Sequence, residues 1–324
     1  MSKPLLSIIV IAYDMPRQAL NTLRSLAPGY QRNVRADDYE VILVENRSHR
    51  NMDVDAISGL PGNFRYFLRD EQGVSPAAAI NFGFSQARGD VIGLMIDGAR
   101  MVTPGVIEHA LMAFRITSNA MVVVPGYNLG EHEQQFHLTH GYSEEKEIGL
   151  LESIDWHNNG YRLFDISCLS AANPNGVFSP FMECNCLFIS ADVFRDIGQA
   201  DERFDLPGGG ALNLYIYGKV ALHPQTRLFM LAGEGSFHQL HGGVTTSEKA
   251  QREESIAEMR QQLNELLGYV YTSPNIEPTI LGKFSLAAMR YLQLSVERGT
   301  ARLHRFLRSN KNPYSGDSSK QAAP

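Results

Sequence analysis

The sequence is poor in cysteine and has no surplus of basic charge. Among its 324 residues there are three cysteines, an odd number, and Cys184 and Cys186 stand one residue apart. Such a set is a poor disulfide framework and fits a reducing compartment. Twenty-nine basic residues against thirty-five acidic ones give a formal net charge of −6. This balance argues against a nucleic-acid-binding protein, which usually carries a basic surplus.

Long apolar runs are also missing. No stretch approaches the roughly 18 residues that span a bilayer. The segment from Met1 to Asp14 lacks the basic start and the small-residue cleavage site of a signal peptide. We therefore expect a cytoplasmic protein, or one peripheral to a membrane. A zinc site at Cys184 and Cys186 is an alternative use of the cysteines, although no second cysteine pair accompanies them.

Apolar runs and helical patterns alternate through the first 125 residues. Continuous β-branched runs predict buried strands at residues 5–12, 39–44, 64–68, 90–96 and 121–125. Apolar residues at helical spacing predict helices at residues 15–27, 75–87 and 104–117. This alternation predicts an α/β fold with a doubly wound, mostly parallel sheet.

Polar residues follow the ends of these strands. They are Tyr13 and Asp14, Glu45 and Asn46, Arg69 and Asp70, and Asp97. Ligands of doubly wound sheets bind outside the carboxyl ends of the strands, so these residues are candidates for a binding site. Capping of the following helices is the alternative use of such acids and amides.

The second half of the chain begins with residues 128–179, a long excursion with weak periodicity over the predicted site. Further strands are predicted at 184–190 and 226–231, and helices at 191–197, 213–220, 246–267 and 280–308. The last helix is basic and amphipathic, so it can lie on an anionic membrane or pack on its own domain. We predict a domain over residues 1–245, a helical extension over 246–309 and a disordered tail over 310–324.

Five segments in this order are similar to a known family. They are Ser7–Asp14, Val44–Ser48, Asn81–Asp90, Ile96–Ala99 and Val193–Phe204. With their spacing, the chain resembles an inverting, metal-dependent nucleotide-sugar glycosyltransferase of the GT-A fold, similar to glycosyltransferase family 2. The resemblance covers roughly residues 5 to 245.

The resemblance implies a donor, a metal ion and an acceptor. The donor is a nucleoside diphosphate sugar linked to UDP or GDP, the cation is Mn²⁺ or Mg²⁺, and the acceptor is a glycan, a lipid-linked sugar or a small molecule with a hydroxyl group. Asp97 is implied near the metal and the ribose. The implied nucleotide-binding residues are Ala12, Tyr13, Asp14, Glu45, Arg69, Asn81 and Asp97.

The chain departs from the family pattern at the metal motif. Ala99 stands where the second acid of Asp-x-Asp is usual, so further ligands must come from elsewhere. His238 and His241 are candidates, because the family often uses a late histidine and imidazole suits Mn²⁺. The alternatives are an ordinary helical pair or simply polar loop residues.

A second departure concerns the general base that an acceptor hydroxyl requires. The place of the usual acidic motif reads Gly208-Gly209-Gly210, without a carboxylate. Asp205, Glu183 and Glu234 are the base candidates. Each can instead be a structural acid: Glu183 as a cap or an ion-pair partner beside Cys184, and Glu234 as a turn residue between two glycines.

Three alternative functions stay open at this point. A domain that binds nucleotide sugar without turnover, or acts as a scaffold, fits the missing base. A nucleotidyltransferase shares the doubly wound architecture, but a glycine-rich phosphate loop does not follow the first strand. A zinc hydrolase built on His238 and His241 lacks the His-Glu-x-x-His order.

Overall fold

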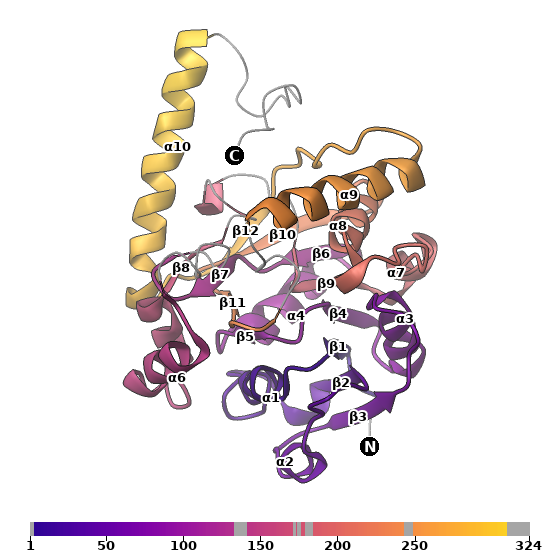
Figure 1. Cartoon of the computed structure of the whole chain (residues 1–324). Coiled ribbons are helices and arrows are strands. Elements are labelled where there is room, and N and C mark those ends of the chain that lie inside the picture. Colours follow the sequence, from indigo (N-terminus) through magenta and orange to yellow (C-terminus); the bar gives the residue numbers. More distant parts are fainter. Residues whose placement is uncertain are drawn as a thin grey trace.

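The protein is described here by a computed structural model, which describes residues 3–132, 141–170, 173, 176–178, 184–242 and 249–309. Two sheets, one of eight strands and one of four, form its framework, and helices cover the larger sheet (Figure 1). The helices are α1 (Pro16–Ser25), α2 (Val54–Ser58), α3 (Ala77–Gln86), α4 (Val106–Ile116), α6 (Glu144–Ser153), α7 (Ala191–Asp196), α8 (Leu212–Ala221), α9 (Lys249–Leu267) and α10 (Met289–Ser309).

The larger sheet has the strand order β12-β10-β6-β9-β4-β1-β2-β3. Its strands are β1 (Leu6–Ala12), β2 (Tyr39–Asn46), β3 (Phe64–Arg69), β4 (Val91–Met95), β6 (Ala120–Val123), β9 (Leu187–Ser190), β10 (Arg227–Ala232) and β12 (Thr279–Gly282). All neighbours are parallel except β9, which runs antiparallel to β4 and β6. The predicted doubly wound, mostly parallel α/β sheet is thus confirmed.

Side chains of β1 show why continuous apolar runs form the central strands. Ile9 and Ile11 pack into one core with α3, α7 and α8, while Ile8 and Val10 pack into another with α1 and α4. Every residue of β1 is buried. A strand covered on both faces needs apolar side chains on both, so its sequence does not alternate.

The chain order of the strands locates the binding edge of the sheet. After β1, the chain adds β2 and β3 on one side and then places β4 on the other side of β1. Crevices form at such a reversal, outside the carboxyl ends of the strands. Tyr13 follows β1 and Asp97 follows β4, so both lie at this edge.

The smaller sheet has the order β5-β11-β7-β8, and its strand β5 begins shortly after Asp97. Its strands are β5 (Arg100–Val102), β7 (Gly126–Leu129), β8 (Ser167–Leu169) and β11 (Ser236–His238). An aromatic core supports it: Tyr127 stacks on Phe237 with ring centroids 5.2 Å apart and meets the edge of Tyr291 at 4.7 Å. Tyr291 belongs to the first turn of α10, which this contact fixes to the sheet.

The C-terminal segment differs from its prediction. Residues 280–308 were expected to be one helix, but Thr279–Gly282 form β12, which pairs in parallel with β10. Gly282 has a φ of +119°, which a helix does not permit, and α10 begins only at Met289. Residues 246–248 of the preceding predicted helix, and the predicted tail over 310–324, lie outside the described residues.

Candidate functional site

Asp97 lies in a tight turn directly after β4. The turn passes so close to β1 that a Cβ on Gly98 would meet the carbonyl oxygen of Ile11 at 2.5 Å. Thr22 of α1 donates to the carbonyl of Gly98 at 2.6 Å, and the amide of Ala99 donates to Asp97 Oδ1 at 3.1 Å. The turn is therefore held by both the sheet and α1.

Ala99, at the position of the second acid in the family motif, is fully buried in the apolar core. A carboxylate there would be desolvated among aliphatic side chains, which is costly for a charged group. The carbonyl of Ala99 instead accepts the amide of Gln239 at 2.8 Å. This bond joins the Asp97 turn to the loop that carries the two late histidines.

His238 and His241 converge on Asp97. His238 Nε2 lies 2.7 Å from Asp97 Oδ2, His241 Nε2 lies 3.5 Å from Asp97 Oδ1, and the two Nε2 atoms are 3.0 Å apart. The three side chains are only 14–20% exposed. In the described part of the chain, this is the one group of three acidic, histidine or cysteine residues with ligand atoms within 4.8 Å of one another.

The charges of this cluster influence one another strongly. Burial alone would raise the pKa of Asp97, but the two imidazoles hold this pKa well below its ordinary value. Burial lowers the pKa of His238 to about 4; Asp97 opposes this shift and Arg100 adds to it. At neutral pH, Asp97 is thus a carboxylate and His238 is a neutral imidazole, the forms in which these groups bind metal ions.

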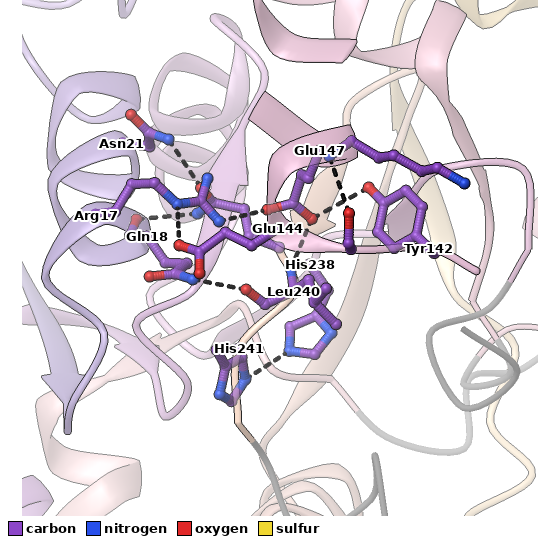
Figure 2. A network of polar contacts seen from close by, with 12 residues as sticks. Arg17, Gln18, Asn21, Tyr142, Glu144, Glu147, His238, Leu240 and His241 are labelled. Carbon is purple, nitrogen blue, oxygen red and sulfur yellow. Dashed lines mark hydrogen bonds and ion pairs between the residues drawn. The ribbon is translucent and has the colours of Figure 1, made fainter. Parts of the chain in front are cut away.

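The histidine loop is held in place by two helices (Figure 2). Leu240, between the two histidines, donates its amide to Glu147 of α6 at 2.6 Å, and its carbonyl accepts Gln18 of α1 at 2.6 Å. Glu147 is fully buried and also accepts Arg17 at 2.9 Å and Tyr142 at 3.2 Å. We call Arg17, Gln18, Glu147 and Leu240 the loop clamp.

Asn21 of α1 extends this fixation to Gln239. Asn21 Nδ2 donates to Gln239 Oε1 at 3.0 Å, and Gln239 Nε2 donates to the carbonyl of Gln18 at 2.9 Å. Each residue between the two histidines is therefore bonded to α1 through its side chain or its backbone. Such rigid support is what an ordered ligand set requires.

The donor set fits a divalent cation. One carboxylate and two imidazoles, side chains that transition-metal ions accept as ligands, have their ligand atoms within 4.8 Å of one another. Asp97, His238 and His241 would hold the ion. Two nitrogen ligands favour Mn²⁺ over Mg²⁺, which prefers oxygen ligands.

At the end of β1, the structure places three predicted nucleotide-binding residues in different environments. Ala12 is buried, whereas the ring of Tyr13 is 59% exposed at the open edge. Asp14 has a φ of +53° and pairs with Arg50, whose Nε lies 3.1 Å from Asp14 Oδ1. Tyr13 is therefore the side chain of the three that is free to stack on a base.

Glu45 and Asn81 have structural partners instead of facing the edge. Glu45 is fully buried, and its carboxylate accepts the amide of Met52 at 3.0 Å and the hydroxyl of Tyr66 at 2.5 Å. Asn81 bonds to the backbone of Ala200 in both directions, at 2.9 and 3.0 Å. Both side chains fix loops of the fold in this way, and a role of either toward the nucleotide stays a prediction.

Arg69 lies over the ring of Phe82, with 4.0 Å from its guanidinium carbon to the ring centroid. It also pairs with Glu71, and its side chain is 30% exposed. These contacts leave it at the rim of the sheet, and a role toward the nucleotide stays a prediction.

The three candidates for the general base differ in where they lie and in how exposed they are. Glu183 lies outside the described residues. Asp205 is exposed beside α9 and accepts Gln262 Nε2 at 2.7 Å. Glu234 is fully buried, so the structure contradicts its prediction as a base.

The carboxylate of Glu234 is occupied by four partners. It accepts the hydroxyl of Thr103 at 2.5 Å, the amide of Gly105 at 3.2 Å and the hydroxyl of Tyr161 at 2.9 Å, and His109 Nδ1 lies 3.3 Å away. An acid surrounded in this way has no access to a substrate hydroxyl. It joins the smaller sheet to α4.

Sequence reasoning missed the loop clamp and Arg100. The clamp left one signal, because Gln18, Asn21 and Thr22 place polar groups on the buried face of α1. Arg100 left none beyond its place three residues after Asp97. The zinc alternative at the cysteines finds no support: Cys184 Sγ donates to the carbonyl of Cys186 at 2.8 Å, and the metal-ligating cluster among the described residues contains neither.

Known proteins are similar to this chain in sequence pattern and in fold. The model of Glycosyl transferase family 2 matches residues 7–179. Among solved structures, residues 1–349 of TarS from S. aureus in complex with UDP-GlcNAc are similar at 12% identity, covering 94% of this chain and 76% of that one, with a TM-score of 0.47. The mannosyltransferase PcManGT from Pyrobaculum calidifontis, in complex with GDP-Man and Mn²⁺, is similar at 11% identity over 98% and 79%, with a TM-score of 0.46. A search of curated proteins found no match.

The fold and its binding edge define a GT-A type transferase, as the sequence predicted. The family match spans more than half of the chain, and the chain therefore belongs to glycosyl transferase family 2. It is a glycosyltransferase. The match ends before β9, so His238 and His241 lie beyond it.

Proposed function

We propose that this glycosyltransferase is metal-dependent and transfers its sugar with inversion to a hydroxyl acceptor. The observation that carries the proposal is the convergence of Asp97, His238 and His241 at the carboxyl edge of the parallel strands. A diphosphate leaving group gains negative charge as the glycosidic bond breaks. A divalent cation bound there supplies the compensating positive charge.

The residues of the chain have separate tasks in this proposal. Asp97 and the two histidines hold the cation, and the loop clamp keeps the histidines in register with Asp97. Tyr13 lies at the open edge where a base can stack on its ring. Inversion requires a general base on the acceptor side, and Asp205 and Glu183 remain the candidates for it.

Nucleotide binding in the presence and absence of metal tests the proposal directly. We would titrate UDP and GDP into the protein by calorimetry, with Mn²⁺, with Mg²⁺ and without metal. We expect one of the two nucleotides to bind more tightly with Mn²⁺ than with Mg²⁺. The Asp97→Asn variant should lose at least about tenfold in this affinity. Asp192→Asn is the matched control, because Asp192 lies on α7 and is exposed.

The outcomes separate the proposal from its alternative. Metal-dependent binding together with release of nucleotide from the nucleotide sugar in the presence of an acceptor supports the transferase. Binding without release on a panel of glycan and lipid-linked acceptors would favour a scaffold that holds nucleotide sugar. Binding that ignores metal and Asp97 in a folded protein would overturn the metal-dependent mechanism.

We also propose that the protein is cytoplasmic and contacts an anionic membrane through α10. In the described part of the chain, each helix is too short or too polar to cross a bilayer. Val296, Leu303 and Leu307 are 51–67% exposed along α10, and the sequence interleaves them with arginines. We expect the protein to sediment with anionic vesicles and Leu303→Glu to reduce this binding; equal sedimentation of both would contradict the contact.

A further inference from the structure

Arg100 is a charged side chain that the proposed mechanism does not yet use. It begins β5, where it pairs in register with His238 of β11. Its side chain is only 12% exposed, and its Nε lies 3.4 Å from Asp97 Oδ2. Nε is buried and makes no hydrogen bond with the described residues. A guanidinium has five N–H donors, so one loose ion pair leaves most of this capacity unused.

The charge of Arg100 changes the net charge of the metal cluster, which is the group of Asp97, His238 and His241. When both histidines are neutral, the form in which imidazoles bind a metal ion, the carboxylate of Asp97 and the guanidinium of Arg100 cancel. Glu147, the acid of the loop clamp, pairs with Arg17 at 2.9 Å, and Arg17 also pairs with the half-exposed Glu144 at 2.8 Å. With a divalent cation bound, the group of Asp97, Arg100 and the two histidines would carry a net charge of +2, whereas a second carboxylate at position 99 would have lowered this charge. The residue at this position is the buried Ala99, whose side chain carries no charge.

We propose that Arg100 is a donor-binding residue that makes metal binding depend on the nucleotide. The diphosphate of a nucleotide sugar carries two negative charges, which match the excess charge of the occupied site. Its oxygens suit the planar donor fork of an arginine, which binds phosphate through paired hydrogen bonds. Without the nucleotide, Arg100 repels the cation and stays paired with Asp97. This inference rests on the proposed function and adds a residue and a binding order to it.

The prediction is an opposite change in two affinities when the charge is removed. In Arg100→Gln, Mn²⁺ alone should bind about tenfold more tightly than in the unchanged protein, because the repulsion is gone. UDP or GDP in saturating Mn²⁺ should bind about tenfold more weakly, because the diphosphate loses its partner. A residue that only supports the fold would weaken both affinities together.

Two further variants sharpen the test. Arg100→Lys keeps the positive charge but not the planar fork, so Mn²⁺ alone should bind as in the unchanged protein while the nucleotide binds more weakly. Arg195→Gln is the matched control. Arg195 lies on α7, which follows antiparallel β9 and therefore starts at the opposite edge of the sheet, and it should change neither affinity.

The measurements are calorimetric titrations of Mn²⁺ alone and of the nucleotide in saturating Mn²⁺, with thermal unfolding to verify folding. Arg100→Gln that binds Mn²⁺ no more tightly, or binds the nucleotide unchanged, would overturn the proposal. If Arg100→Gln does not fold, Arg100→Lys tests the proposal. Weaker nucleotide binding with unchanged Mn²⁺ binding would support it, and a loss of both affinities would overturn it. A different result would overturn the proposed function: the unchanged protein would bind the nucleotide equally well without Mn²⁺.

Discussion

Two acids that look alike in the sequence have opposite uses in the structure. Asp97 is 20% exposed at the binding edge, with its oxygens directed at two imidazoles. Glu234 stands four residues before His238 but is fully buried under four donors. The difference lies in the partners, which come from distant segments of the chain. At this scale, the environment decides whether an acid binds a ligand or fixes the fold.

The Glu234 network predicts a loss of stability rather than of chemistry. In Glu234→Gln, a donor group replaces an acceptor beside Thr103, Gly105 and Tyr161. We expect the free energy of unfolding to fall by about 3 kcal/mol, as measured by urea denaturation. Glu152→Gln, on the exposed face of α6, should stay within about 0.5 kcal/mol of the unchanged protein. Unchanged stability with lost turnover would instead restore Glu234 as the base.

His109 gives the same network a pH dependence. Its hydrogen bond with Glu234 raises its pKa above the ordinary value, although burial opposes the shift. A histidine with a raised folded-state pKa stabilises the fold at pH values below about 6.5, and this contribution is lost as the pH rises through the folded-state pKa. The advantage of the unchanged protein over His109→Gln in unfolding free energy should therefore be largest near about pH 6 and shrink toward about pH 8.5. Urea denaturation across this range measures it, and a constant difference would contradict it.

At the scale of elements, the loop clamp connects two helices to the metal cluster. Helix α6 belongs to the long excursion after β7, yet its Glu147 holds the amide of Leu240 between the two histidines (Figure 2). Helix α1 holds the carbonyl of the same residue through Gln18. The seating of α6 therefore affects the geometry of a site to which it contributes no ligand.

Neighbouring glutamates on α6 offer a matched test of this clamp. Glu144 and Glu147 both pair with Arg17, at 2.8 and 2.9 Å, but only Glu147 also accepts Leu240. Glu147→Gln should weaken Mn²⁺-dependent nucleotide binding by about tenfold or more, because the histidine loop loses its support. Glu144→Gln breaks a half-exposed ion pair and should change the affinity less than about twofold. Calorimetry on both variants measures the effect, and equal affinities would contradict the clamp.

The length and burial of each element determined how well the sequence predicted it. The strands β1, β2 and β4 are buried apolar runs with local signals, and their prediction is confirmed. The strands β5, β8 and β11 have three residues each, too few to show a period, and β5 pairs with β11 from a distant part of the chain. The strand β12 is an exposed edge whose Ile280 and Leu281 continue the apolar pattern of the helix behind it.

A site residue could be predicted when its own place in the sequence indicates its role. It could not be predicted when a partner from another segment of the chain determines that role. Asp97 follows a strong strand, and the histidines stand in a glycine-rich loop after another, so their meeting agrees with the prediction; that they bind metal stays a proposal. Glu45 and Asn81 carried equally good signals, yet Glu45 accepts the hydroxyl of Tyr66 and Asn81 the amide of Ala200, both from later segments of the chain. No local pattern records these partners.

For the whole molecule, the C-terminal segment is part of the framework as well as an extension. The strand β12 pairs with β10, and Leu263 of α9 is buried in the core beside α8. In the first turns of α10, Tyr291 contacts Tyr127 of the smaller sheet, and Ser295 accepts the amide of Val177, in a short 3-10 helix, at 3.1 Å. Beyond these turns, α10 leaves the body of the molecule (Figure 1).

Two truncations separate these roles. A chain that ends at residue 299 keeps β12, Tyr291 and Ser295, and should unfold within about 2 °C of the full chain. A chain that ends at residue 245, the proposed domain boundary, loses the edge strand and part of the aromatic core, and its unfolding temperature should fall by more than about 5 °C. Thermal unfolding measures both, and equal stability of the shorter chain would make residues 1–245 an independent domain.

The antiparallel course of β9 has a consequence for how this protein can diversify. Val123 at the end of β6 pairs with Leu187 at the start of β9, and the amide of Val124 bonds to the carbonyl of Cys186 at 3.3 Å. The long excursion between them thus leaves and re-enters the framework at one closed junction. Lengthening a flexible loop between fixed ends costs little entropy, because the closure cost grows only with the logarithm of loop length. Exchange of this segment between relatives, grafted at Val124 and Cys186, would leave the sheet intact but would have to preserve Glu147, because the segment carries the α6 part of the loop clamp.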